Sequence, residues 1–121
     1  DPSEIVYQNR VATTDATVPT LHTFTIPAST TVMSAARVVA RRTGGSAGAA
    51  EDGMIARLTS GYKNVAGTAT LLGNIDTAYL GTAGWVIALT PSGGNVLLQV
   101  TGAVNVNISW HMTTRTYSVS T

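Results

Sequence analysis

The feature that most constrains this chain is a strict alternation of apolar and polar residues near its C-terminus. From Val106 to Met112, every second side chain is apolar and those between are polar. A period of two places the apolar side chains on one face of an extended strand, whereas a helix would need a period near 3.6. The segment is therefore predicted to be a half-buried β-strand.

Two segments just before it show the same alternation. In Trp85–Leu89, every second residue from Trp85 onward is apolar and shares one face of the strand. In Val96–Val100, every second residue from Val96 onward does the same. Turn-forming residues, Pro91–Gly94 and Gly102–Ala103, separate the segments. Together with Val106–Met112, they predict a three-strand antiparallel meander.

Upstream, short runs rich in β-branched and aromatic residues lie between turn sequences, which is the pattern of an antiparallel sandwich or barrel. The strands predicted there are Ile5–Val11, His22–Ile26, Met54–Lys63 and Thr68–Leu72. The expected fold is a single all-β domain over residues 1–121, an antiparallel β-sandwich or jelly-roll-like arrangement with the C-terminal meander. Residues 1–30 are expected to form its first strands or an N-terminal arm.

The segment Thr31–Arg42 leaves two interpretations open. Arg37 and Arg41, four residues apart with glycines beyond, suit a helix. The period-two alternation and the β-branched valines of the segment favour a strand.

Composition narrows the classes of partner. Charged residues make up 11% of the chain and the net charge is +1, against about 25% charged residues in ordinary domains. The basic residues look scattered along the sequence except for one short cluster, so no nucleic-acid binding is expected. No apolar run is long enough to span a membrane, so no membrane insertion is expected. The chain has no cysteine, which excludes disulfides and thiolate metal sites, and its start at Asp1 suggests a processed or excised piece.

Few residues point to chemistry. The two histidines, His22 and His111, lack nearby carboxylates in the sequence, so no metal site is expected. Glu51 and Asp52 are adjacent, not spaced as a catalytic pair. The glycine-rich stretch Gly44–Gly48 lacks the Lys and Ser/Thr of a phosphate-binding loop. We therefore expect no enzyme and no cofactor.

Ligand contacts are expected on turns rather than on strand interiors, because loops carry binding in sandwich folds. The two segments favoured are Thr43–Gly53 and Asn74–Gly84, both interpreted as loops. Trp85 and Trp110 align with apolar neighbours and are predicted to lie in the core. The candidate ligand-binding residues are Tyr79, Thr43, Ser46, Asp52 and Asp76.

Several stretches resemble a β-domain of tailed bacteriophages and prophages, found in tail fibres, tail appendages and related virion surface proteins. The stretches that carry the resemblance are Val38–Gly48, Tyr62–Thr68, Leu72–Gly73, Val100–Ala103 and Ile108–His111. The resemblance runs from about Thr31 to the C-terminus and rests on turn glycines and strand alternation. It implies a virion component that has other virion proteins as partners and contributes to assembly or to attachment to the host surface. A host cell-surface glycan is a further candidate partner.

Apolar residues on both strand faces, such as Val39, Val86 and Leu97, predict that another chain covers part of the surface. The expected state is a homo-oligomer, and the resemblance to fibre domains implies a trimer. Two alternatives stay open: a monomeric carbohydrate-binding module of a larger enzyme, and a capsid or decoration protein. A monomer in solution would favour the carbohydrate-binding module.

Overall fold

The computed structural model of the chain describes residues 2–82 and 84–121, with only the backbone described at Pro2. Its regular elements in these ranges are all strands. In chain order they are β1 (Pro2–Thr13), β2 (Thr20–Thr25), β3 (Thr30–Gly45), β4 (Gly53–Val65), β5 (Thr68–Gly81), β6 (Val86–Ser92), β7 (Asn95–Thr101) and β8 (Val106–Ser120). No helix in the part of the chain that the structure describes is able to span a membrane.

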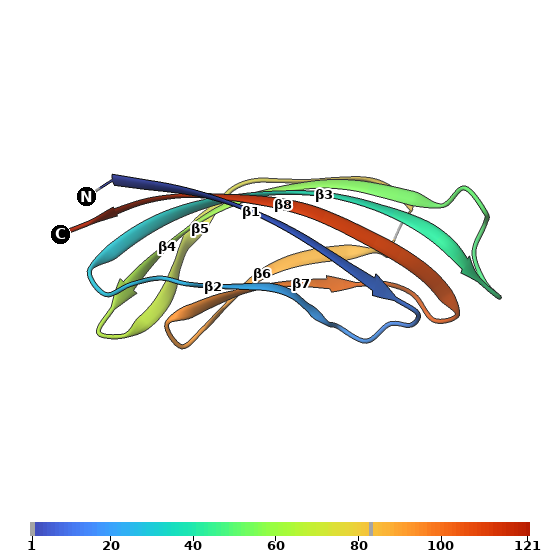
Figure 1. Ribbon diagram of the computed structural model, residues 1–121, viewed down its shortest axis with the longest axis horizontal. Coiled ribbons are helices and arrows are strands. Elements are labelled where there is room, and N and C mark those ends of the chain that lie inside the picture. Colours follow the sequence, from blue (N-terminus) through green and yellow to red (C-terminus); the bar gives the residue numbers. More distant parts are fainter. Residues whose placement is uncertain (1, 83) are drawn as a thin grey trace.

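The strands form two antiparallel layers that face each other, which confirms the predicted all-β sandwich (Figure 1). The large sheet has five strands in the order β1-β8-β3-β4-β5. The small sheet has three strands in the order β2-β7-β6. Both termini lie at the same end of the large sheet, where Pro2 pairs with Val119 (Figure 1).

The predicted C-terminal meander is wrong in its third member. β6 and β7 pair antiparallel, with Leu89 opposite Leu98, as expected. Val106–Met112 is a strand, but it belongs to the large sheet, between β1 and β3. Alternation fixes which face of a strand is buried, but it carries no information about the neighbouring strand. β7 and β8 bury their apolar faces in the same core from opposite sheets, so their patterns look alike.

Thr31–Arg42 is a strand, within β3, and the helical alternative is excluded. Val32, Val38 and Ala40 are buried, while Arg37 and Arg41 lie on the exposed face. The strand is paired on both sides, to β8 and to β4. Its β-branched valines pack well on such a pleated surface.

β5 is longer than predicted, and the loop expected over Asn74–Gly84 is wrong for most of its length. The strand continues from Thr68 to Gly81. Two irregularities in its pairing with β4, at Thr59/Ser60 and Gly61/Tyr62, shift the register and break the period of two. As an edge strand with both faces largely exposed, β5 also lacks the apolar alternation that marks the other strands.

The core contains two apolar clusters. The larger one includes Trp85 and Trp110, whose ring centroids are 6.1 Å apart, and both are buried as predicted. The smaller one forms around Phe24, Ile26 and Tyr62. Buried hydroxyl groups lie on the inner face as well: Ser60 donates to the Tyr62 hydroxyl at 2.9 Å, and that hydroxyl donates to the Leu89 carbonyl at 3.4 Å.

Candidate interaction surface on the large sheet

The solvent-facing side of the large sheet, called here the outer face, carries most of the charge of the protein. Its positions follow from the register, in which residues of the five strands lie opposite one another. One row runs Arg10, His111, Val39, Ile55, Leu80, and the next runs Gln8, Thr113, Arg37, Arg57, Ala78.

Six of the seven basic residues of the chain project from this outer face, together with two acidic residues, Glu4 and Asp76. The basic residues are Arg10, Arg37, Arg41, Arg57, Lys63 and Arg115. The interpretation that the basic residues are scattered is therefore wrong. Alternation along four different strands brings them to one side, which is not visible when each strand is taken alone.

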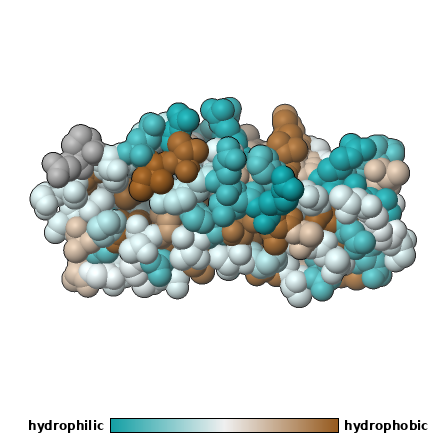
Figure 2. Space-filling view, viewed as in Figure 1, coloured by the Kyte–Doolittle hydropathy of each residue, from teal (hydrophilic) through white to brown (hydrophobic). Residues whose placement is uncertain are grey.

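Strongly hydrophilic residues gather on the side of the large sheet, with apolar groups between them (Figure 2). The small sheet differs: the sequences of β2, β6 and β7 contain no aspartate, glutamate, lysine or arginine. The net charge of +1 thus conceals a polarised molecule with one basic side and one neutral side.

A cationic band crosses the middle of the outer face. It consists of Arg115 on β8, Arg37 on β3 and Arg57 on β4, three neighbouring strands. Arg57 is ion-paired with Asp76 on β5. A hydrogen bond with Tyr117, and then the nearby charges, raise the pKa of Arg115.

Next to the band lies an apolar row formed by Val39, Ile55 and Leu80. These side chains are 57%, 52% and 68% exposed and lie opposite one another on β3, β4 and β5. With Arg37 and His111, among others, they line an open hollow of about 550 Å³. An exposed apolar row of this kind on a basic face is a candidate contact for another macromolecule.

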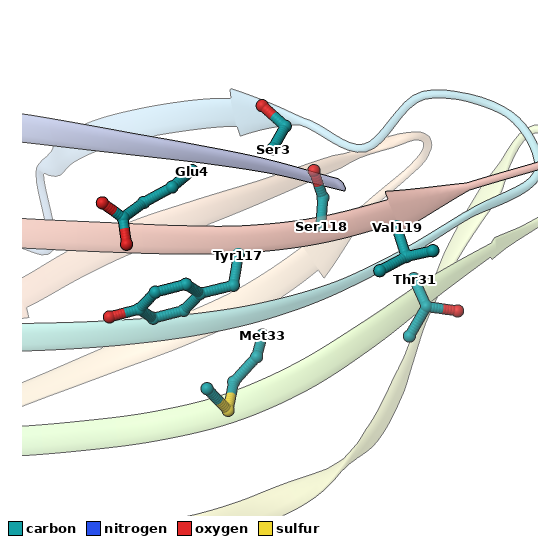
Figure 3. A pocket seen from close by; sticks show the side chains of 7 residues that line it. All are labelled: Ser3, Glu4, Thr31, Met33, Tyr117, Ser118 and Val119. Carbon is teal, nitrogen blue, oxygen red and sulfur yellow. The ribbon is translucent and has the colours of Figure 1, made fainter. Parts of the chain in front are cut away.

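A second hollow lies at the end of the large sheet that carries both termini. Tyr117 on β8 lies between Met33 on β3 and Glu4 on β1, and its ring extends alongside the Met33 side chain (Figure 3). The hollow has a volume of about 570 Å³ and its wall is mostly apolar.

β5 forms one lateral edge of the large sheet, called here the β5 edge. Its large apolar side chains are widely exposed: Leu71, Leu72, Ile75, Tyr79 and Leu80, of which Ile75 is 74% exposed. The only charged residue of the strand is Asp76, which Arg57 neutralises. The β5 edge is therefore long, apolar and almost uncharged.

The candidate ligand-binding residues fall into two groups that lie on different elements. Ser46 and Asp52 lie in the connection between β3 and β4, as expected. Thr43 was expected in the same loop but lies within β3, because the strand continues to Gly45. There the Asp52 carboxylate accepts the Ala49 N–H at 2.8 Å, and the Thr43 hydroxyl donates to the Asn107 carbonyl at 3.3 Å.

Asp76 and Tyr79 lie on β5 instead of in a loop. Asp76 is engaged with Arg57. Tyr79 donates its hydroxyl to the Ile87 carbonyl at 2.7 Å, bridging β5 to β6, and its side chain remains 38% exposed. Burial raises the pKa of Tyr79. The cationic band was not predicted from the sequence. The only sign of it was that each of its arginines falls on the polar positions of its own alternating strand.

The two histidines lie apart. His111 is exposed on the outer face, as predicted. His22 is half-buried beside Tyr7, with ring centroids 4.4 Å apart, and burial lowers its pKa. Within residues 2–82 and 84–121, no three His, Asp or Glu side chains are grouped so as to hold a metal ion.

No known protein family and no curated protein matches the sequence. Two solved structures are similar to the chain. The tailspike protein of Acinetobacter baumannii phage AM24 has 12% identity and a TM-score of 0.49, over 96% of this chain and 27% of the tailspike. The tailspike protein of Acinetobacter phage vB_ApiP_P1 has 12% identity and a TM-score of 0.38, over 98% of this chain and 21% of the tailspike. The chain therefore spans only about a quarter of the length of each of these tailspikes.

Proposed function

We propose that the chain is a structural domain of a phage virion, which assembles with other copies of itself through the β5 edge and contributes to attachment to the host surface. The observation that carries the proposal is the β5 edge, a strand of 14 residues with exposed apolar side chains and a single, neutralised charge. The resemblance of the sequence to tail fibre and tail appendage domains supplies the biological setting.

An unpaired edge strand presents free backbone N–H and C=O groups to other chains. Soluble monomers protect such edges with charges, prolines, short strands or β-bulges, and of these devices β5 has the two irregularities in its pairing with β4 and one neutralised charge. β5 has no proline and no lysine, and its apolar side chains continue onto the sheet through Leu80 and the apolar row. These properties suit a surface that a neighbouring subunit covers.

The occupant of the β5 edge is a second copy of this chain. Pairing of two β5 edges, or of β5 with another edge of the next subunit, brings no uncompensated charge into the interface, because Asp76 already has Arg57 as its partner. The resemblance to fibre domains favours three copies around an axis. Many copies on one particle would multiply weak surface contacts into firm attachment.

Sedimentation equilibrium at micromolar concentration tests the assembly. The expected result is a species of three times the 12.5 kDa chain mass. Ile75→Lys and Leu80→Lys place a charge in the contact and are expected to shift the protein toward monomer. Val104→Lys is the matched control, since Val104 is 63% exposed but lies far along the chain from β5.

A wild-type protein that sediments as a 12.5 kDa monomer would refute the assembly and favour the carbohydrate-binding module. Equal dissociation by Val104→Lys would show that the β5 edge is not the contact. Attachment is tested separately, by binding of the oligomer to host cells. Ser46→Ala, in the connection after β3, and Thr43→Val, near the end of β3, are expected to weaken attachment without changing the oligomeric state.

A further inference from the structure

We propose that the outer face carries an anion-binding site, a small hollow between Arg37 and Arg115 that takes an oxyanion of carboxylate or sulfate chemistry. This goes beyond the proposed function, since assembly through β5 needs no anion. The hollow lies on β3 and β8, in the middle of the large sheet, and not at the β5 edge.

The hollow is small and partly enclosed. Its lining residues are Ala35, Arg37, Thr113, Arg115 and Tyr117, and its volume is about 160 Å³. That is several times the roughly 30 Å³ that one water occupies in the liquid, and fits a carboxylate or sulfate group. Ala35 lies opposite Arg115 and two residues before Arg37 on the same face of β3, so a small side chain adjoins both arginine positions.

The lining supplies donors and no competing carboxylate. Each guanidinium offers five N–H donors in a planar fork that matches an oxyanion, and Thr113 and Tyr117 add hydroxyl groups. Tyr117 lies two residues after Arg115 on the same face of β8, so its side chain borders the site as well. Glu4 lines the neighbouring hollow, on the other side of Tyr117.

Arg37 lacks an acidic partner. It lies directly opposite Arg57, and like charges opposite each other in a sheet destabilise it. Arg57 is compensated by Asp76, and Arg115 is near Glu4. In the described part of the chain, no side chain pairs with the Arg37 guanidinium. An oxyanion in the hollow would supply the missing negative charge next to Arg37, with Arg115 as a second donor.

The test is an NMR titration with sodium sulfate and with sodium acetate, with ionic strength held constant by chloride. Saturable shifts of the Thr113 and Arg115 amide signals are expected. Arg37→Gln and Arg115→Gln should each weaken sulfate binding about tenfold or more, since hydrogen bonds to charged groups are among the stronger ones. Arg10→Gln and Arg41→Gln are matched controls on the same face, outside the hollow, and should leave binding unchanged.

Shifts that rise linearly without saturation, or equal weakening by all four variants, would overturn the proposal, because either result means general screening of a basic face. A second arm compares polyglutamate with duplex DNA. Binding of polyglutamate that depends on Arg37 and Arg115 supports the site. Tighter binding of DNA that depends equally on Arg10 and Arg41 would contradict it and assign the whole face to phosphate backbones.

Discussion

Trp110 donates its indole N–H to the Thr13 hydroxyl at 2.9 Å, in the buried layer between the two sheets. Trp110 is on β8 and Thr13 is the last residue of β1, so the bond closes the end of the β1–β8 pair. A buried N–H without an acceptor costs free energy, so this one contact makes a sharp stability prediction.

Thr13→Val keeps the shape of the side chain and removes the acceptor. We expect the free energy of unfolding to fall by about 1–3 kcal/mol, the usual cost of a buried unsatisfied donor. Urea unfolding followed by tryptophan fluorescence measures the change. Thr23→Val, at an exposed position of β2, is the control and should change stability little. Equal effects of both substitutions would contradict the assigned role of the hydrogen bond.

His22 predicts a loss of stability on mild acidification. Burial lowers its pKa in the folded protein below the ordinary value of 6.5, and its Nε2 atom has no partner in the described part of the chain. The unfolded chain therefore binds a proton first as the pH falls. The stability associated with neutral His22 is fully present above the unfolded pKa and is lost as the pH falls toward the folded pKa.

The measurement is the melting temperature between pH 7.5 and pH 5.5 for the wild type and His22→Phe, which keeps the aromatic contact with Tyr7. The variant should show a smaller decrease over this range. His111→Phe, at an exposed position, should retain the wild-type dependence. If His22→Phe follows the wild-type curve, burial of His22 does not contribute.

Gly45 occupies a position where we expect no side chain to be tolerated. Its φ of +107° is in the region that favours glycine, and an added Cβ would overlap the Asn105 carbonyl. Gly45→Ala should destabilise the protein by about 1–3 kcal/mol or more, as expected for a strained backbone with a clash. Gly93→Ala, which also has positive φ but open space around it, should cost less in the same thermal unfolding experiment.

The ion pair between Arg57 and Asp76 is predicted to contribute little stability. The side chains are 57% and 35% exposed, and solvent screens such pairs, so Asp76→Asn should change the free energy of unfolding by less than about 1 kcal/mol. The same substitution leaves Arg57 uncompensated opposite Arg37. Sulfate should then bind more tightly than to the wild type, and an unchanged affinity would show that the charges of the band act independently.

The sequence predicted the elements better than their arrangement. Alternation located β3, β4 and the C-terminal strands because each buries one face, and it predicted the burial of Trp85 and Trp110. It could not place β8 in the large sheet, since pairing partners leave no trace in the period of a single strand. Only Thr68–Leu72 of β5 was predicted, because bulges and exposure on both faces remove the period from the rest of the strand.

The candidate site was also predicted only in part. The loop position of Ser46 and Asp52 followed from turn residues, but the cationic band depends on the register between β8, β3 and β4. Each arginine of the band is ordinary within its own strand. Only the pairing of Arg37 with Arg57 and of Ala35 with Arg115 turns them into a surface with a hollow.

The side-by-side termini have a mechanical consequence. β1 and β8 run antiparallel with Pro2 beside Val119, so a pull on both ends acts at the same end of the pair (Figure 1). Tension applied there would break the ladder of hydrogen bonds between β1 and β8 one pair after another, instead of loading all of them at once in shear. A particle that loads this domain through its two ends would therefore meet a weak link between β1 and β8, whereas a load carried through β5 would leave that ladder at rest.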